Sequence, residues 1–127
     1  MSRVFVLGRA VLGSFFVLAG MSKVADPSAP TAMMTEQGFP VPGLLLPLVI
    51  ALEVGGGLVV ATGWRRLLLP ACLALTVFTV STNLGFHRFW GLDGEMRQLE
   101  LSLFFKNLAV AGGLLAVAGA SRKGGRA

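Results

Sequence analysis

The chain has 127 residues, of which 54% are hydrophobic and only 13% charged, and it carries a formal net charge of +5. An ordinary soluble domain has roughly a quarter charged residues and a smaller apolar share. Because a short chain cannot hide so much apolar surface from water, the composition excludes a water-soluble globule and favours a single domain that lies in lipid.

Four apolar stretches are long enough to cross a membrane. They cover residues 4–24, 44–63, 67–86 and 101–120. At a helical rise of about 1.5 Å per residue, each reaches about 30 Å, the thickness of the hydrocarbon core. Arg9 interrupts the first stretch, so we expect a retained helix and not a signal peptide. The prediction is an all-α, integral membrane four-helix bundle over residues 1–127.

The two longer connections are expected to close one end of this bundle. Asp26 or Ser28 can cap a short helix that extends to Gln37 and stops at Gly38. Its apolar side chains would let this helix lie at the membrane interface in the first outer loop. The fourth helix is expected to begin near Glu95, above the membrane.

The basic residues predict the orientation of the chain. One side of the membrane would hold six basic residues and no acidic ones, namely Arg3, Arg65, Arg66, Arg122, Lys123 and Arg126. The positive-inside rule then predicts a bacterial-type inner membrane protein with both termini in the cytoplasm. The high net charge is therefore a topology signal, and nucleic acid is not an expected partner.

Small or polar residues recur at helical spacing in every predicted span, which favours close helix packing. The stripes are Arg9, Gly13, Phe16, Gly20 and Lys23; Glu53, Gly56, Gly57 and Val60; Cys72, Thr76, Thr79, Asn83 and His87; and Ser102, Lys106, Ala109, Gly113 and Ala116. We expect these stripes to form the interior of the bundle. The surrounding lipid bilayer is the first expected partner, and a homo-oligomer is left open.

A carboxylate near the middle of the membrane needs a partner. Glu53 lies about ten residues from either end of its span, and Arg9 could reach it from the neighbouring antiparallel helix. The expected Arg9–Glu53 ion pair has two interpretations, a structural contact that fixes helix register or a carboxylate coupled to proton or electron transfer.

A second polar cluster is predicted near the outer leaflet. It contains Lys23, His87, Trp90, Lys106 and Asn107, with Asn83, Phe86 and Phe89 alongside. Hydrogen-bond donors beside flat aromatic rings would suit a quinone headgroup, whose two carbonyl oxygens accept hydrogen bonds. The alternative is that the two lysines reach lipid headgroups and that the histidine caps its helix.

Residue counts exclude several chemistries for a single chain. Cys72 is the only cysteine, so an internal disulfide is impossible, and one histidine cannot form a bis-histidine haem site. We expect no metal site and no covalently bound cofactor.

Five motifs in register resemble the DoxX family of small four-helix membrane proteins. They are Gly20-Met21-Ser22-Lys23-Val24-Ala25-Asp26-Pro27, Gln37-Gly38-Phe39-Pro40, Glu53 with Gly56-Gly57, His87-Arg88-Phe89-Trp90, and Phe105-Lys106-Asn107 with Gly112-Gly113-Leu114-Leu115. The namesake of the family looks like a membrane subunit of a thiosulfate:quinone oxidoreductase. The resemblance implies a redox-associated, quinone-linked subunit with a redox-protein partner, and it transfers no catalytic residue.

Two other functions fit the same residues. A small proton-coupled four-helix transporter would depend on one buried carboxylate, and a non-catalytic assembly or scaffold protein would need no ligand. Whether the chain is itself an enzyme is left open by these residues.

Overall fold

The computed structural model describes residues 2–124, and it confirms an all-helical fold with four helices long and apolar enough to span a membrane. The helices are α1 (Arg3–Ala25), α2 (Ser28–Glu36), α3 (Pro42–Thr62), α4 (Arg65–Phe86), the short 3-10 helix η1 (Phe89–Gly91) and α5 (Gly94–Gly124). Arg126 and the side chain of Lys123, both counted in the predicted basic end, lie outside what is described.

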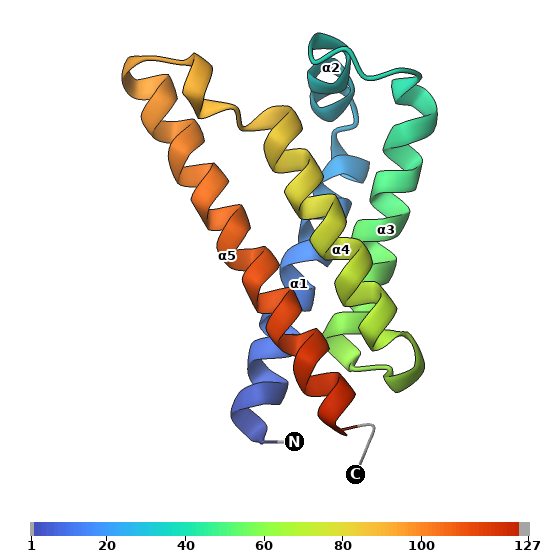
Figure 1. The fold of residues 1–127 in the computed structure, drawn as a ribbon. Helices are drawn as coiled ribbons and strands as arrows, with labels where there is room; N and C mark the ends of the chain where they lie inside the picture. Colours follow the sequence, from blue (N-terminus) through green and yellow to red (C-terminus); the bar gives the residue numbers. More distant parts are fainter. Residues whose placement is uncertain (1, 125–127) are drawn as a thin grey trace.

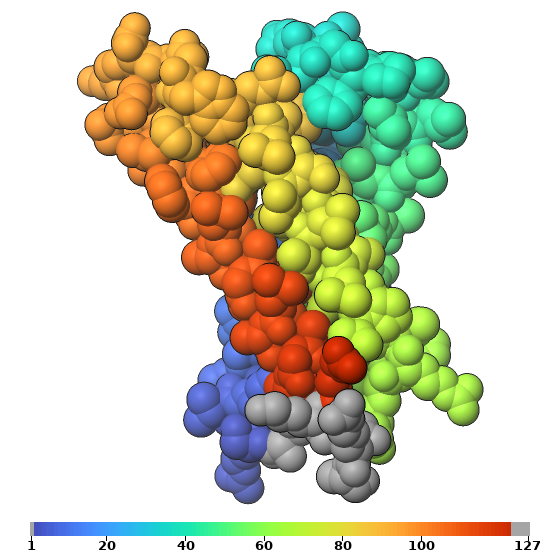
Figure 2. All heavy atoms as spheres, in the orientation of Figure 1, coloured from blue at the N-terminus to red at the C-terminus, as the bar shows by residue number. Residues whose placement is uncertain are grey.

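The four long helices run alternately up and down (Figure 1). Both ends of the described chain lie at the end that also holds the α3–α4 turn, while α2 and the α4–α5 connection lie at the opposite end, here called the outer end. The closest helix pairs are α1 with α3 and α4 with α5, and α3 and α4 connect the two pairs. The molecule widens toward the outer end, with α2 on one side and the α4–α5 connection on the other (Figure 2).

Glycines hold α1 and α3 in close contact. A Cβ added at Gly13 would lie 2.3 Å from the backbone nitrogen of Ala61, and one at Gly20 would lie 2.6 Å from Val54 Cγ2. Because apolar side chains gain little by leaving lipid, such close backbone approach is the main source of attraction between membrane helices. The predicted stripe on the first helix is therefore a packing face, and Gly13, Phe16 and Gly20 are its buried members.

The predicted stripe on the fourth span is wrong. Ser102, Lys106, Ala109 and Ala116 are exposed and Gly113 is half-buried, whereas Ala111, Leu114, Val117 and Ala118 form the buried face of α5. One residue rotates a helix position by about 100°, so the choice between adjacent small residues decides which side faces inward. The fully buried Leu114 and the buried Val117 contribute the larger side chains of α5 to the core.

The outer connections form as expected, within a residue or two. Asp26 accepts hydrogen bonds from the backbone nitrogen and the hydroxyl of Ser28 at 3.2 and 2.6 Å, and it thereby orders the start of α2. Gly38 follows α2 with a φ of 77°, a left-handed conformation that glycine adopts without strain. Met34 is the buried residue of α2.

Candidate functional site

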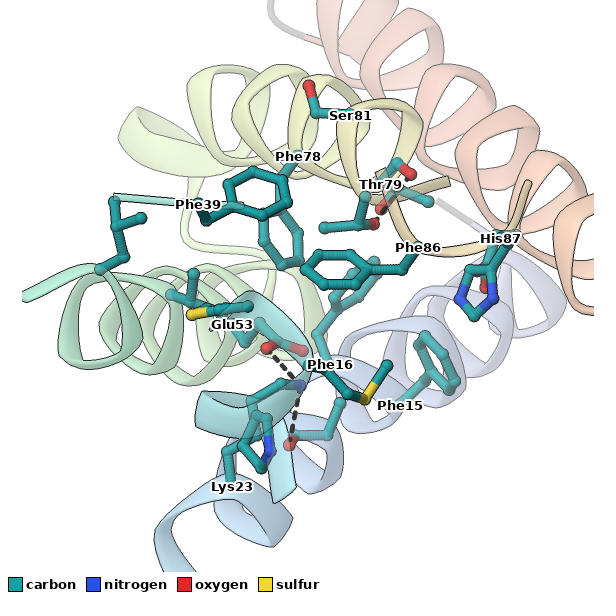
Figure 3. A pocket seen from close by; sticks show the side chains of 18 residues that line it. Phe15, Phe16, Lys23, Phe39, Glu53, Phe78, Thr79, Ser81, Phe86 and His87 are labelled. Carbon is teal, nitrogen blue, oxygen red and sulfur yellow. Dashed lines mark hydrogen bonds and ion pairs between the residues drawn. The ribbon is translucent and has the colours of Figure 1, made fainter. Parts of the chain in front are cut away.

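A cavity of about 470 Å³ lies inside the outer half of the bundle, within the range of small-molecule sites. Its wall is mostly apolar, with side chains from all five α-helices, and phenylalanines are prominent in it (Figure 3). The aromatic members are Phe15, Phe16, Phe39, Phe78 and Phe86. The rings of Phe39 and Phe86 stack with centroids 5.2 Å apart, and Met33 and Met34 of α2 also line the cavity. Helix α2 thus contributes side chains to the cavity wall.

A lysine–glutamate pair forms one polar part of this wall. Lys23 Nζ lies 2.7 Å from Glu53 Oε1 and donates to the carbonyl oxygen of Ala19 at 3.4 Å (Figure 3). Helical side chains lean toward the N-terminus of their own helix. Because α1 and α3 are antiparallel, Lys23 leans into the bundle and Glu53 leans outward to meet it. The glutamate side chain is 4% exposed, so the lysine supplies the counter-charge that a carboxylate in lipid requires.

The expected Arg9–Glu53 ion pair is wrong, because Lys23 occupies the position predicted for Arg9 at the carboxylate. The glycine contacts set the register, in which Gly20 lies beside Glu53 and Gly13 lies beside Ala61. Arg9 is therefore about 21 Å from Lys23 along the helix, and its side chain leans further away. Its guanidinium packs against Gly63 at the end of α3, where an added Cβ would overlap it.

Asn107 and Thr79 form a second polar part of the wall, and Asn83 is hydrogen-bonded to Asn107. Asn107 Nδ2 donates to Asn83 Oδ1 at 3.0 Å, and Asn83 Nδ2 donates to the carbonyl oxygen of Phe104 at 2.9 Å. These bonds tie α4 to α5 and orient Asn107, which lines the cavity. Thr79 also lines the cavity and is 5% exposed, and within the described part of the chain its hydroxyl has no hydrogen-bond partner. Leaving a buried hydroxyl unpaired costs free energy, so this group has unused hydrogen-bonding capacity beside the cavity.

His87 and Glu100 form a second ionisable pair at the rim. Nδ1 of His87, the residue that ends α4, lies 2.6 Å from Oε2 of Glu100 on α5. The imidazole lines the cavity, and because the carboxylate occupies Nδ1, the ring nitrogen left for a ligand is Nε2.

The other two predicted site residues lie elsewhere. Lys106 is exposed, and Trp90 is 56% exposed in an aromatic cluster with Phe89 of η1 and with Phe104 and Phe105 in the outer half of α5. Neither lines the cavity. Of the five residues expected to surround one ligand, the structure brings three to the same cavity, namely Lys23, His87 and Asn107.

Sequence reasoning missed Thr79 as a residue of the cavity wall, Glu100 as the histidine's partner, and the wall residues Phe15, Phe16, Phe39 and Phe78. Thr79 lay on the polar stripe of its span, four residues before Asn83, so its position did carry a signal. No comparable pattern in the sequence indicated that Glu100 contacts His87, because the two residues lie on either side of the irregular α4–α5 connection. Among the described residues, no group of three His, Cys, Asp or Glu side chains could hold a metal ion.

Comparisons with known proteins place the chain in a family. The DoxX family model matches residues 4–88, which include Lys23, Glu53, Thr79 and His87. The chain is 33% identical to the inner membrane protein YqjF of Escherichia coli (strain K12) over 113 residues, which cover 89% of this chain and 80% of that protein. It is 22% identical to the inner membrane protein YphA of the same organism over 113 residues, 89% of this chain and 79% of that protein. No solved structure matches it. The chain belongs to the DoxX family of membrane proteins.

Proposed function

We propose that the protein is a quinone-binding membrane subunit of a redox system and that the aromatic cavity holds the quinone headgroup. The observation that carries this proposal is the buried Thr79 hydroxyl, which has no partner in the described residues, in an aromatic cavity of about 470 Å³. A quinone is a flat apolar ring with two hydrogen-bond acceptors. Aromatic rings and convergent donors are the features that such a ligand requires.

The residues divide this task between them. The stacked rings of Phe39 and Phe86 offer a flat apolar surface. Thr79 can donate its hydroxyl proton to one ligand carbonyl, and Lys23 holds positive charge beside the cavity. A bound quinone would supply reversible two-electron chemistry, with electrons passed to or from a redox-protein partner. The protein's own contribution is binding, orientation and the exclusion of water.

The proposal is tested by measuring the binding of menadione to the detergent-purified protein with titration calorimetry. We expect saturable binding that Thr79→Val weakens about threefold to tenfold, the value of one lost hydrogen bond. Ala19→Phe should abolish binding, since Ala19 lines the cavity and the larger ring would fill it. Lys106→Ala is the matched control and should leave the affinity unchanged, because this residue is exposed outside the cavity. Equal binding by wild type and Ala19→Phe would refute the site.

The proposed location is the inner membrane with both termini in the cytoplasm. The two relatives described above are inner membrane proteins. Arg3, Arg65, Arg66 and Arg122 all belong to the end of the bundle where the described chain begins and ends. The positive-inside rule assigns such an end to the cytoplasm.

A proton-coupled transporter is the second candidate, favoured by one observation. Glu53 is a buried carboxylate that faces a cavity within the membrane-spanning bundle. Its contact with Lys23 argues against this role, since a carboxylate that carries protons must be free to lose its charge. Proton-driven dye efflux by the wild type, abolished in Glu53→Gln, would establish the transporter and overturn our ranking.

A further inference from the structure

The cavity has two ionic contacts, and their carboxylates differ in exposure. The glutamate of the Lys23–Glu53 pair is 4% exposed, which seals it inside the bundle. The side chains of His87 and Glu100 are 19% and 18% exposed, so this pair reaches both the cavity and the outer end. The Glu100 carboxylate is thus the more exposed of the two carboxylates, while the Lys23 side chain of the first pair is itself 27% exposed.

We propose that His87 exchanges a proton with a hydroxyl of the cavity's ligand through Nε2, with Glu100 as the positioning residue that holds Nδ1–H. The inference deepens the proposed function and rests on it, because it assigns the group that would handle the proton of a phenol-type or hydroquinone-type headgroup. Imidazole suits this role, since it gains and loses a proton near neutral pH.

The transfer balances without an electron donor or acceptor. The ligand O–H bond breaks, an Nε2–H bond forms, and the ligand oxygen keeps the electron pair as an anion. The imidazolium then lies between this oxygen and the Glu100 carboxylate, whose 2.6 Å contact stabilises the positive charge. On return, the proton moves back to the ligand or to water at the exposed rim.

The charges around His87 support a transfer at this position. Glu100 faces it from α5, and Asn107 of the same helix lines the cavity as a neutral group. Across the cavity, Lys23 of α1 is neutralised by Glu53 of α3. The lining residues of α2, which are Pro30, Met33 and Met34, carry no charge. The Glu100 carboxylate is thus the nearest compensating charge for a protonated His87 in the described residues.

4-Nitrophenol tests the inference, because this single-ring phenol turns yellow when it loses its proton. The probe is titrated with the purified protein at a pH where it is colourless in detergent micelles, and menadione is then added as a competitor. We expect a yellow bound form that menadione displaces. His87→Gln should bind the probe without colour, and Glu100→Gln should require a higher pH to reach half of the bound colour. Lys106→Ala should match the wild type.

Each outcome separates the inference from the proposed function. A probe that binds, is displaced by menadione and stays colourless refutes proton transfer to His87 and leaves the quinone site intact. If the probe bound to His87→Gln is still yellow, the assignment of His87 as the proton acceptor is likewise refuted. Absence of saturable binding of both menadione and 4-nitrophenol overturns the proposed function and this inference with it. Circular dichroism and gel filtration confirm that each variant is folded. If His87→Gln does not fold, Glu100→Gln, a substitution at the exposed rim, tests the inference in its place.

Discussion

Lys23 has an unusual role for a lysine near the end of a membrane helix. Such side chains commonly extend toward the headgroups, but this one lies at the C-terminal end of α1 and leans back into the bundle. It gains Glu53 and the carbonyl oxygen of Ala19 as partners there. The direction in which a helical side chain leans thus decides between a lipid contact and a contact with the cavity.

Removal of one charge of the Lys23–Glu53 pair should destabilise the fold more than removal of both charges. Lys23→Met leaves an uncompensated carboxylate, and we expect a loss of about 3 kcal/mol in the free energy of unfolding, the low end for a broken buried pair because the lysine side chain is 27% exposed. The double variant Lys23→Met, Glu53→Gln should recover most of this lost stability. Thermal unfolding in one detergent measures both, and a double variant no more stable than the single one would contradict the pair's role.

The sequence predicted that Lys106 and Asn107 would share one site, and adjacent positions on a helix cannot both do so easily. They differ by about 100° around the axis, so the one that faces Asn83 turns the other outward. A single sequence contains no information about which of the two points inward, because both are polar. Packing of the whole α4–α5 interface decides it.

At the scale of elements, the α1–α3 interface depends on backbone contact. Gly57 and Gly55 lie on the same helix, and they provide a matched pair of substitutions. A Cβ at Gly57 would lie 2.7 Å from the carbonyl oxygen of Gly13 and 2.9 Å from Val17 atoms, whereas a Cβ at Gly55 would meet nothing within 4 Å.

Gly57→Ala should therefore separate the two helices and cost about 1–3 kcal/mol, in the range for an overpacked core. Gly55→Ala should leave stability unchanged or raise it by up to about 1 kcal/mol, since alanine is the better helix former. Thermal unfolding of the two variants side by side provides the measurement. Equal stabilities would mean that the close approach of α1 and α3 contributes nothing.

The start of α2 carries a pH-dependent contact outside the membrane-spanning helices. Hydrogen bonds from the Ser28 hydroxyl and then the Ser28 backbone hold the pKa of Asp26 below its ordinary value of 3.8. A lowered carboxyl pKa stabilises the folded segment above the ordinary value, and this stabilisation is lost as the pH falls through the folded value.

Ser28→Ala removes the first of these bonds, so the Asp26 carboxyl should titrate at a higher pH than in the wild type. Carbon NMR of labelled aspartate, followed over pH 2 to about 6, reads this shift directly. The NMR signal of Asp93, which lies in the other outer connection, serves as the internal control and should be the same in both proteins. An unchanged Asp26 titration would show that Ser28 does not hold the carboxylate.

At the scale of the whole molecule, the fold followed from the sequence far better than the site did. Apolar length and glycine spacing are local signals, and they predicted four long helices and the stripe on α1 correctly. The partner of Glu53 depended on the register between two helices, which the glycine contacts define only in three dimensions. The sequence predicted that the connection containing α2 would close one end of the bundle, but it did not predict which side chains of this connection line a cavity.

The orientation of the molecule is the last property that its charge distribution predicts. The α3–α4 turn lies at the basic end and the α4–α5 connection lies at the outer end, so the two should be exposed on opposite sides of the membrane. Trp64 in the α3–α4 turn is 59% exposed, and Asp93 in the α4–α5 connection is also exposed. A cysteine at either position would therefore be accessible to a reagent on its own side.

Cys72 is fully buried and is replaced by alanine to give a cysteine-free background. With both termini in the cytoplasm, a membrane-impermeant maleimide should label Asp93→Cys in intact spheroplasts and Trp64→Cys only in inverted vesicles. The reverse pattern would place the basic end outside. It would also place the His87–Glu100 pair on the cytoplasmic side, and protons exchanged at the cavity would then equilibrate with the cytoplasm. The labelling pattern therefore determines from which compartment the proposed site takes its proton.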